Sequence, residues 1–491
     1  MPSPIPQPKG YPLVGNLFDI DSQNPWGSFN KLALKNKYRE YHPSPDVPPS
    51  LSSFLIVLAL QKGPIFKINI LGKDLVFVTG AALLEEVCDE KRFRKCVSGP
   101  IVQIRDAVHC SLFTAYEKEM EDWGIAHRIM APMVSTEAVA ELYSGMKETM
   151  PDLIKKWTAG PRQRVNVTND LDRLNHAANM LCFFNQRVDC VNGPEPPAIH
   201  AHEESTVEAT RRSSRMKLVN WLFHQKKYDN YIKIMRDYGA DIIAHRKAYP
   251  TDKNDMLNAL MNGKDPQTGK GLTESQVQDE IINCFIGSAT APNLISFALY
   301  YLMKNPDTIR QAREEIDAVV GVSESVEQEH LARLPYCKAI IDETFRLSAV
   351  APGFNLEPHP DDEGPVLLAG GEYEIPRKQA LIVLLSAVGR DPAVFEDPDA
   401  FKPERMLGEK FDRLPAGVKK RFGNGKRECI GKRYAYEWSF MTLVSILKDV
   451  EFELADANYV MNNDGVNYNG AFSVKPQGFF AVTGPRQRSG H

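Results

Sequence analysis

Residues 422–431 read FGNGKRECIG, the most informative stretch of the chain. Its glycines allow the backbone to turn tightly and leave room for a flat ligand against the loop. We expect a helix to begin at about Cys429, so that the helix N-terminus and the neighbouring Lys426, Arg427 and Lys432 lower the pKa of the thiol. A single thiolate on a rigid loop is a soft metal ligand that suits the axial position of haem iron. A glycine-rich loop with a buried, inert cysteine is the weaker alternative.

A pair of opposite charges, Glu343 and Arg346, lies three residues apart on a predicted helix and therefore on one face. Taken alone, it reads best as a surface ion pair worth about 0.3 kcal/mol. The later motif FKPER, which ends at Arg405, changes this interpretation. A second arginine could complete a buried charge network that holds the loop before Cys429 rigid, provided that every charge is paired.

Two shorter patterns leave alternatives open. Trp123 and His127 share one helix face at i,i+4, and a core tryptophan beside a satisfied histidine is the favoured reading. Thr290 lies in a long apolar helix, where a threonine hydroxyl usually donates to the i−4 carbonyl, here that of Ile286. That structural role and a catalytic role weigh about equally for Thr290.

Composition excludes several classes of protein. The 491 residues are 43% hydrophobic and 25% charged, which is globular rather than disordered. The net charge of −4 gives no reason to expect nucleic acid as a partner. Eight scattered cysteines without a CxxC pair favour neither a disulfide scaffold nor a zinc cluster. We find no signal peptide and no membrane-length apolar run, so we expect a soluble, cytoplasmic protein without a transmembrane segment.

Hydrophobic periodicity predicts a mostly α protein with a small β part, in one domain over 1–491. The expected elements are a hairpin over 64–79 turning at 72–74, short strands within 364–388, and helices over 81–98, 117–158, 216–248, 273–302 (kinked by Pro292), 306–319, 335–348 and 429–447. The polar segment 192–215 reads as mobile surface. Residues 37–62 interrupt the pattern as an atypical insertion, which we interpret as translated non-coding sequence from a faulty gene model; a spliced transcript containing these codons would reject this.

The order and spacing of these features resemble the cytochrome P450 family. The chain is most similar to the haem domains of fungal and bacterial self-sufficient fatty-acid hydroxylases, which are fused to a diflavin reductase. PIPQPKGYPLVGNLFDID, NGKDPQTG, ISFALYYL, FKPER and FGNGKRECIG carry the resemblance over nearly the whole chain. It implies the P450 fold, with haem b between the long central helix and the helix after Cys429.

The resemblance also implies a function. We expect a monooxygenase that inserts one oxygen atom from O2 into an apolar, fatty-acid-like substrate. The electrons would come from NADPH through the FAD and FMN of a reductase, either a separate partner or a fused domain that we do not find in this sequence. A basic patch over 419–421 with Lys426, Lys432 and Arg433 would dock it.

The resemblance assigns roles to individual residues. Cys429 is the axial ligand of the haem iron, and Thr290 relays protons to dioxygen. The residues that bind haem are Lys95, Trp123, His127, Phe422 and Arg427. The fold-holding network consists of Glu343, Arg346 and Arg405. The substrate pocket is formed by Lys73, Ile101, Val108, Phe113, Ile286, Ala351 and Pro352.

Four positions depart from the family pattern. Ala289 replaces the acid before Thr290, which removes a group that organises proton delivery. Ile286 replaces a small residue over the iron, and Lys73 and Phe77 replace the arginine and tyrosine that hold a substrate carboxylate. These changes keep two alternatives open. One is a non-standard haem-thiolate enzyme that performs hydroperoxide rearrangement, dehydration or peroxide-driven oxidation, and the other is a haem-binding protein without turnover.

Overall fold

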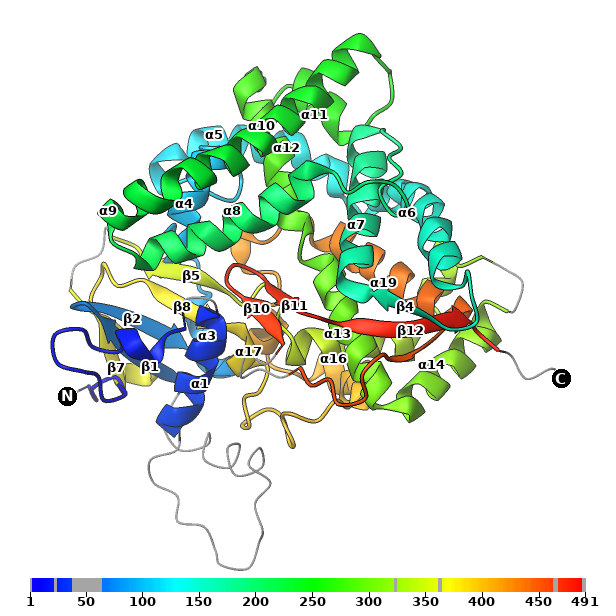
Figure 1. Cartoon of the computed structure of the whole chain (residues 1–491). Helices are drawn as coiled ribbons and strands as arrows, with labels where there is room; N and C mark the ends of the chain where they lie inside the picture. The colour runs from blue at the N-terminus through cyan, green and yellow to red at the C-terminus, as the bar shows by residue number, and fades with distance from the viewer. Residues whose placement is uncertain are drawn as a thin grey trace, which may run out of the picture. The chain divides into compact units, whose positions relative to one another are not determined.

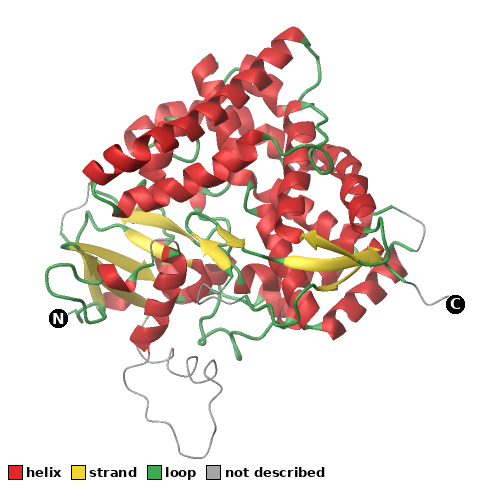
Figure 2. Ribbon diagram, viewed as in Figure 1, coloured by secondary structure: helices red, strands yellow, loops and turns green. Residues whose placement is uncertain are grey.

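A computed structural model describes residues 2–21, 24–37, 64–321, 325–360, 364–461 and 467–487 (Figures 1 and 2). All but one residue of the predicted insertion over 37–62 lies outside the described residues, so its interpretation stays a hypothesis. The chain divides into two compact units. We call Met1–Ser98, Asp342–Cys429 and Val460–Val474 the sheet unit, and Gly99–Ile341, Ile430–Tyr459 and Lys475–His491 the helical unit. The single domain over 1–491 stays a prediction.

The sheet unit is built on a five-stranded sheet. Its strand order is β1-β2-β8-β5-β3, with β2 and β8 parallel and the other neighbours antiparallel. The strands are β1 (Ile65–Ile70), β2 (Lys73–Val78), β8 (Leu381–Leu384), β5 (Gly353–Pro358) and β3 (Phe93–Lys95). The hairpin β1–β2 confirms the prediction over 64–79, although it turns at Leu71 and Gly72, both with positive φ, as a two-residue hairpin requires.

The core of the sheet unit explains the alternation of β1 and β2. Phe66 and Phe77 are 3% and 0% exposed and stack on each other, with ring centroids 4.8 Å apart. They pack with Leu32 of α1 and Leu384 of β8. The unit also contains α1 (Pro25–Lys37), α3 (Ala81–Val87), α17 (Leu385–Val388), α18 (Gly408–Asp412), β6 (Val366–Leu368), β7 (Tyr373–Ile375), β10 (Tyr468–Gly470), η1 (Leu17–Asp19), η6 (Ala369–Gly371), η7 (Pro403–Met406), η8 (Ala416–Lys419) and η9 (Gly425–Arg427).

Helices make up most of the helical unit (Figure 2). They are α4 (Pro100–Val108), α5 (Met120–Met130), α6 (Thr136–Trp157), α7 (Val167–Phe184), α8 (Pro197–Ser214), α9 (Lys217–Val219), α10 (Gln225–Ala248), α11 (Met256–Asn262), α12 (Glu274–Ser288), α13 (Ala291–Lys304), α14 (Pro306–Val319), α15 (Gln328–Leu331) and α19 (Lys432–Asp449), with the short turns η3 (Glu117–Glu119), η4 (Ala131–Val134) and η5 (Asn220–His224). A three-stranded sheet orders β4 (Gln163–Asn166), β12 (Phe480–Pro485) and β9 (Val450–Leu454) as β4-β12-β9. The division between the units falls within α16 (Pro335–Leu347) and β11 (Val474–Pro476), and elsewhere it falls between elements. The prediction of a mostly α protein with a small β part is confirmed.

The predicted long helix over 273–302 is divided into α12 and α13. Pro292 has no N–H to offer the carbonyl of Ser288, four residues earlier, so the helix is interrupted at Ala289 and Thr290. The side chain of Asn175 on α7 supplies the missing donor, with its Nδ2 3.1 Å from the Ser288 oxygen. A side chain from another helix therefore stabilises the break.

Several predicted boundaries were wrong. Most of the segment 192–215 forms α8. Its buried Thr206 and Thr210 donate to carbonyls of the preceding turn, so their hydroxyls are hydrogen-bonded inside the helix. The predicted helix over 81–98 ends at Val87, and β3 follows because it pairs with β5. The helix over 117–158 is interrupted at Pro132, after which Ser135 caps α6.

The described helices include one stretch with the length and apolar character of a membrane span. It covers Glu274–Lys304, which is α12 and α13 together. Of its most apolar window, 61% is buried inside the protein, as in the core helix of a protein that crosses no membrane. It is therefore weak evidence for a membrane span.

Candidate functional site

The loop before Cys429 is tightly closed within the sheet unit. The Cys429 N–H donates to the Phe422 carbonyl at 2.9 Å, and Gly423 and Gly425 have φ values of +88° and +60°. A Cβ at Gly425 would lie 2.0 Å from the Glu90 carboxyl carbon, and the positive φ of this residue favours glycine as well. The loop therefore has a defined shape that ends on an exposed cysteine.

Two basic side chains, Lys95 and Arg427, lie near this cysteine. Burial lowers the pKa of the Lys95 ammonium well below its usual range, the Arg427 guanidinium lowers it further, and Cys429 raises it. Since both groups act on the pKa of Lys95, the fold brings Lys95 close to Arg427 and Cys429, which lie far from it in the sequence. The following helix, α19, begins at Lys432 and not at Cys429 as predicted, so a direct effect of its N-terminus on the thiol stays a prediction.

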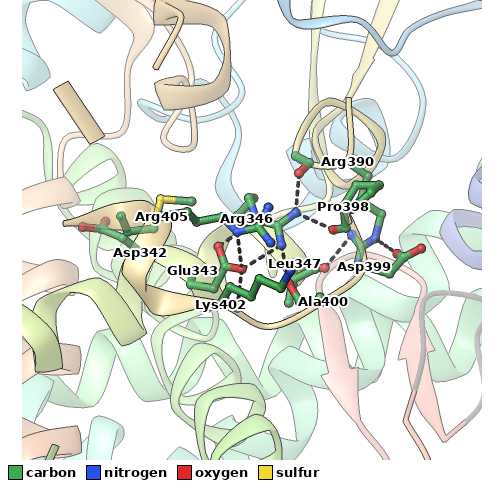
Figure 3. Close-up of polar contacts among 12 residues, drawn as sticks. Asp342, Glu343, Arg346, Leu347, Arg390, Pro398, Asp399, Ala400, Lys402 and Arg405 are labelled. Carbon is green, nitrogen blue, oxygen red and sulfur yellow. Dashed lines mark hydrogen bonds and ion pairs between the residues drawn. The ribbon is translucent and has the colours of Figure 1, made fainter. Parts of the chain in front are cut away.

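The predicted charge network is present in the sheet unit (Figure 3). Arg346 donates to both carboxylate oxygens of Glu343, each at 2.7 Å, and its other N–H groups donate to the carbonyls of Gly389, Pro398 and Ala400. The Glu343 side chain is 0% exposed and also accepts from the Lys402 N–H at 2.9 Å. Arg405 Nε lies 3.4 Å from Glu343 Oε1. The surface ion pair considered from sequence is thus a buried one, and all five N–H donors of Arg346 have acceptors.

In the helical unit, Trp123 and His127 of α5 stack on each other. Their ring centroids are 4.6 Å apart at an interplanar angle of 23°. Trp123 is 9% exposed, and its indole N–H donates to the Leu112 carbonyl at 3.2 Å. The pair therefore lies on one helix face as predicted, next to the segment that carries Phe113.

Thr290 lies at the break between α12 and α13. Its hydroxyl donates to the Gly287 carbonyl at 3.2 Å, three residues earlier, and not to that of Ile286 as the sequence suggested. The interruption at Ala289 and Thr290 ends the regular i−4 geometry, which accounts for the difference. Thr290 is half-buried, whereas Ile286 is only 4% exposed.

The family model for cytochrome P450 matches residues 48–480. This chain belongs to the cytochrome P450 family. The members of this family are haem-dependent monooxygenases, in agreement with the sequence prediction.

This P450 chain is similar to fungal proteins that combine a P450 with its reductase. The "Bifunctional cytochrome P450/NADPH--P450 reductase" of Aspergillus oryzae is 34% identical over 98% of this chain and 41% of its own length. The "Self-sufficient cytochrome P450 monooxygenase CYP505E3" of Phanerodontia chrysosporium is 33% identical over 99% of this chain and 43% of its own length. The chain spans about two fifths of the length of these relatives. Their names include a monooxygenase and a reductase, and so give no support to the alternative of a rearranging or peroxide-driven enzyme.

The cysteines of this P450 differ in burial, and this difference indicates which of them can hold a haem iron. Burial raises the pKa of six thiols to about 11 or 12, and that of Cys337 well above its usual range, so these seven are protonated at neutral pH. Cys429 is the exposed cysteine among the eight. No group of three His, Cys, Asp or Glu residues in the described ranges could hold a metal ion. A single exposed cysteine near two basic side chains therefore suits a metal whose other ligands come from a porphyrin with carboxylate substituents.

The predicted substrate-pocket residues are buried to very different extents. Val108 and Ile286 are 0% and 4% exposed, and Pro352 is also buried. Ile101 and Phe113 are half-buried, whereas Lys73 and Ala351 are exposed. Lys73 is the first residue of β2, away from the buried end of the strand that carries Phe77. The role of these residues in a common pocket stays a prediction.

Sequence reasoning missed three polar residues of the helical unit. Asn175 stabilises the helix break at Ser288, and Asp279 and Glu280 of α12 are 4% and 2% exposed. Two adjacent acids in QVQDEIINCF, at the start of a long helix that is otherwise uncharged from Val277 to Met303, are a signal that could have been noticed. A buried acid needs a hydrogen-bond or ion-pair partner, and this requirement would have identified Asp279 and Glu280 as residues with a specific contact.

Proposed function

We propose that this P450 chain binds haem b through Cys429 and inserts one oxygen atom from O2 into an apolar, fatty-acid-like substrate. The observation that carries the proposal is the closed glycine loop that presents an exposed Cys429 beside Lys95 and Arg427. When bound, the haem supplies an iron centre that activates dioxygen, and electron donation from the thiolate favours O–O cleavage. NADPH provides the electrons through the FAD and FMN of a reductase, and we expect the protein in the cytoplasm.

The residues around Cys429 hold the haem in this proposal. Lys95 and Arg427 neutralise propionate carboxylates, and a guanidinium matches a carboxylate with two donors. His127 donates to a propionate from α5, and Trp123 supports it by stacking on the imidazole while its own indole N–H donates to the Leu112 carbonyl. Phe422 packs against the porphyrin. The network of Glu343, Arg346 and Arg405 ties α16 to the carbonyls of residues 389–400, and Arg421, next to the loop, pairs with Asp342 of the same helix, so that α16 supports the loop.

Thr290 delivers protons in this proposal. Its hydroxyl lies at the interrupted turn of the helix, where regular backbone hydrogen bonding ends. Ala289 offers no carboxyl next to it, so the hydroxyl must exchange protons with water or with the substrate. Ile286 adds bulk one turn earlier and restricts how a substrate approaches.

Apolar side chains define the proposed substrate class. Ile101, Val108, Phe113 and Ile286 come from α4, the loop after it and α12, and the resemblance adds Ala351 and Pro352. Lys73 is exposed and provides a single positive charge for a carboxylate head group. A fatty acid or a similar apolar molecule with one anionic end matches this combination.

The reductase is the proposed protein partner. Lys426, Lys432 and Arg433 are exposed and give the region around the cysteine loop positive charge for docking an acidic flavoprotein. Arg421 is not available for this purpose, because its side chain pairs with the buried Asp342 at 2.7 Å.

The ligand role of Cys429 is tested by the carbon monoxide difference spectrum of the ferrous protein. The unchanged chain should show the red-shifted Soret band of a thiolate-bound haem, and Cys429→Ser should lose it. Cys190→Ser is the matched control, because serine can still donate to the Arg173 carbonyl as the thiol does. A band that survives in Cys429→Ser would reject the assignment.

The reaction is tested with NADPH, a P450 reductase and a fatty acid. Product formation that requires NADPH and O2 supports the monooxygenase. Ala289→Asp should raise the product formed per NADPH consumed, because it restores an acid beside Thr290. Turnover with a hydroperoxide but not with NADPH would reject the proposal and favour the alternative chemistry.

A further inference from the structure

The backbone N–H and the backbone carbonyl of Leu112 are both bound by side chains of the helical unit. Its N–H donates to Glu280 Oε1 of α12 at 2.9 Å, and its carbonyl accepts from the Trp123 indole of α5 at 3.2 Å. Leu112 is the residue immediately before Phe113. The direction in which the chain enters Phe113 is therefore set by two side chains from two helices.

A buried glutamate makes such a contact at a higher cost in free energy than a neutral side chain would. Its side chain is buried at 2% exposure in an apolar helix, and its second oxygen accepts from Asn283 Nδ2 at 3.0 Å. Among the described residues, no lysine, arginine or histidine forms an ion pair with it. Burying a carboxyl without a cation costs free energy, and the two hydrogen bonds of Glu280 are the contacts that can offset this cost.

The neighbouring acid, Asp279, holds the start of the same loop. Asp279 Oδ1 lies 3.0 Å from His109 Nδ1 and accepts from Arg236 Nη1 at 2.8 Å. His109 has a φ of +37°, which is unusual for a residue with a side chain, and Arg236 also donates to the Ala107 carbonyl at 2.8 Å. Two adjacent acids of α12 therefore fix both ends of the segment 109–112.

The segment is also closed internally. The Thr114 hydroxyl donates to the His109 carbonyl at 2.7 Å, and the Ala115 N–H donates to the Ser111 carbonyl at 3.0 Å. Arg105 Nη1 donates to the Thr114 carbonyl at 2.7 Å. A loop with this many internal bonds moves as one body, so releasing Leu112 from α12 should displace Phe113 as well.

We propose that Glu280 is a positioning residue: by holding the Leu112 N–H, it sets where Phe113 lies and hence which carbon of the substrate is presented for oxidation. The proposal rests on the function proposed above, since Phe113 is there a substrate-contacting residue. It concerns selectivity more than rate, because a shifted side chain changes the orientation in which a flexible substrate binds.

The state of the carboxyl indicates which substitution should preserve the contact. Burial raises the pKa of Glu280 to about 8, Asp279 raises it slightly, and the donors at Leu112 and Asn283 lower it. Near neutral pH the side chain is therefore mostly a neutral acid. Glutamine has the same length and an acceptor oxygen, whereas leucine has neither oxygen.

The first experiment measures the distribution of hydroxylated isomers from lauric acid with NADPH and a reductase. Glu280→Leu should change the ratio of the main isomers by about threefold or more, and Glu280→Gln should keep it close to that of the unchanged protein. Glu315→Leu is the control, because Glu315 also accepts backbone N–H groups, those of Tyr336 and Cys337 at 2.8 and 2.9 Å, but does not contact the segment 109–112. An isomer ratio in Glu280→Leu that equals that of the control would overturn the proposal.

A second measurement needs neither haem nor turnover. Amide hydrogen exchange should become faster over residues 109–115 in Glu280→Leu and stay unchanged there in Glu315→Leu, with the reverse pattern over residues 335–338. Unchanged exchange over 109–115 in Glu280→Leu would also overturn the proposal. Failure of the proposed function is recognised separately, because the unchanged protein would then lack the Soret band or form no lauric acid product.

Discussion

Glu343 in the sheet unit and Glu280 in the helical unit are equally buried, at 0% and 2% exposure, but have different partners. Glu343 faces the guanidinium groups of Arg346 and Arg405 (Figure 3). Glu280 faces an amide side chain and a backbone N–H. Equal burial is therefore compatible with different partners, which are cations for Glu343 and neutral donors for Glu280.

The two sites also differ in what they hold together. Arg346 uses its donors on Glu343 and on three carbonyls between residues 389 and 400, so the charge pair ties a helix to a long connection. Glu280 ties a helix to a single peptide group. A change at Glu343 should consequently affect stability most, and a change at Glu280 should affect local geometry and its dependence on pH.

The largest effect is expected for Glu343→Gln. It leaves the Arg346 guanidinium buried without its carboxylate, which should lower the free energy of unfolding by about 3–5 kcal/mol. Urea unfolding at neutral pH measures this. Glu409→Gln is the control, because its pair with Arg413 is 80–82% exposed and should change stability by less than about 0.5 kcal/mol. Similar losses in both variants would contradict the assigned importance of the buried pair.

Glu280→Gln should have a smaller effect that depends on pH. The raised pKa of Glu280, about 8 in the folded protein against 4.5 for the ordinary group, means that the folded state retains a proton that the unfolded state has lost. The unchanged protein should therefore lose stability as the pH rises from about 4.5 to about 8, while the glutamine variant lacks this contribution.

The difference between these two proteins is the quantity to measure, because groups that do not interact with Glu280 contribute equally to both. The charged groups nearest to Glu280 are Asp279, which faces it, and His109 and Arg236, which face Asp279. The advantage of Glu280→Gln should grow by about 3 kcal/mol between about pH 5 and about pH 7.5 in urea unfolding. A difference that is constant with pH would show that Glu280 titrates like an exposed acid.

Arg405→Met should have the smallest effect of the three. Arg405 Nε is 3.4 Å from Glu343 Oε1, a longer contact than the two at 2.7 Å from Arg346, and Arg405 also donates to the Glu396 carbonyl. Because the shorter pair remains, we expect a loss of about 1–2 kcal/mol in urea unfolding. A loss as large as that of Glu343→Gln would mean that both arginines are equally necessary.

The sequence by itself determined the family, the mostly α fold and the candidate ligand Cys429. Short motifs were sufficient for these because a glycine loop or an i,i+3 charge pair is specified by neighbouring residues. It also predicted the hairpin β1–β2 and the helix 306–319, whose patterns are local. The helical segment α8 was mistaken for mobile surface, because its threonines satisfy their polarity inside the helix, which composition does not reveal.

Only the tertiary structure decided which charges are paired. Leu112 and Glu280 are 168 residues apart, and the carbonyls that complete the bonding of Arg346 lie 43 to 54 residues away. The helix break at Thr290 depends likewise on Asn175, 113 residues from the carbonyl that it caps. A residue type shows that an acid or a carbonyl needs a partner, but the energy of the contact depends on distance and burial, which exist only once the chain has folded.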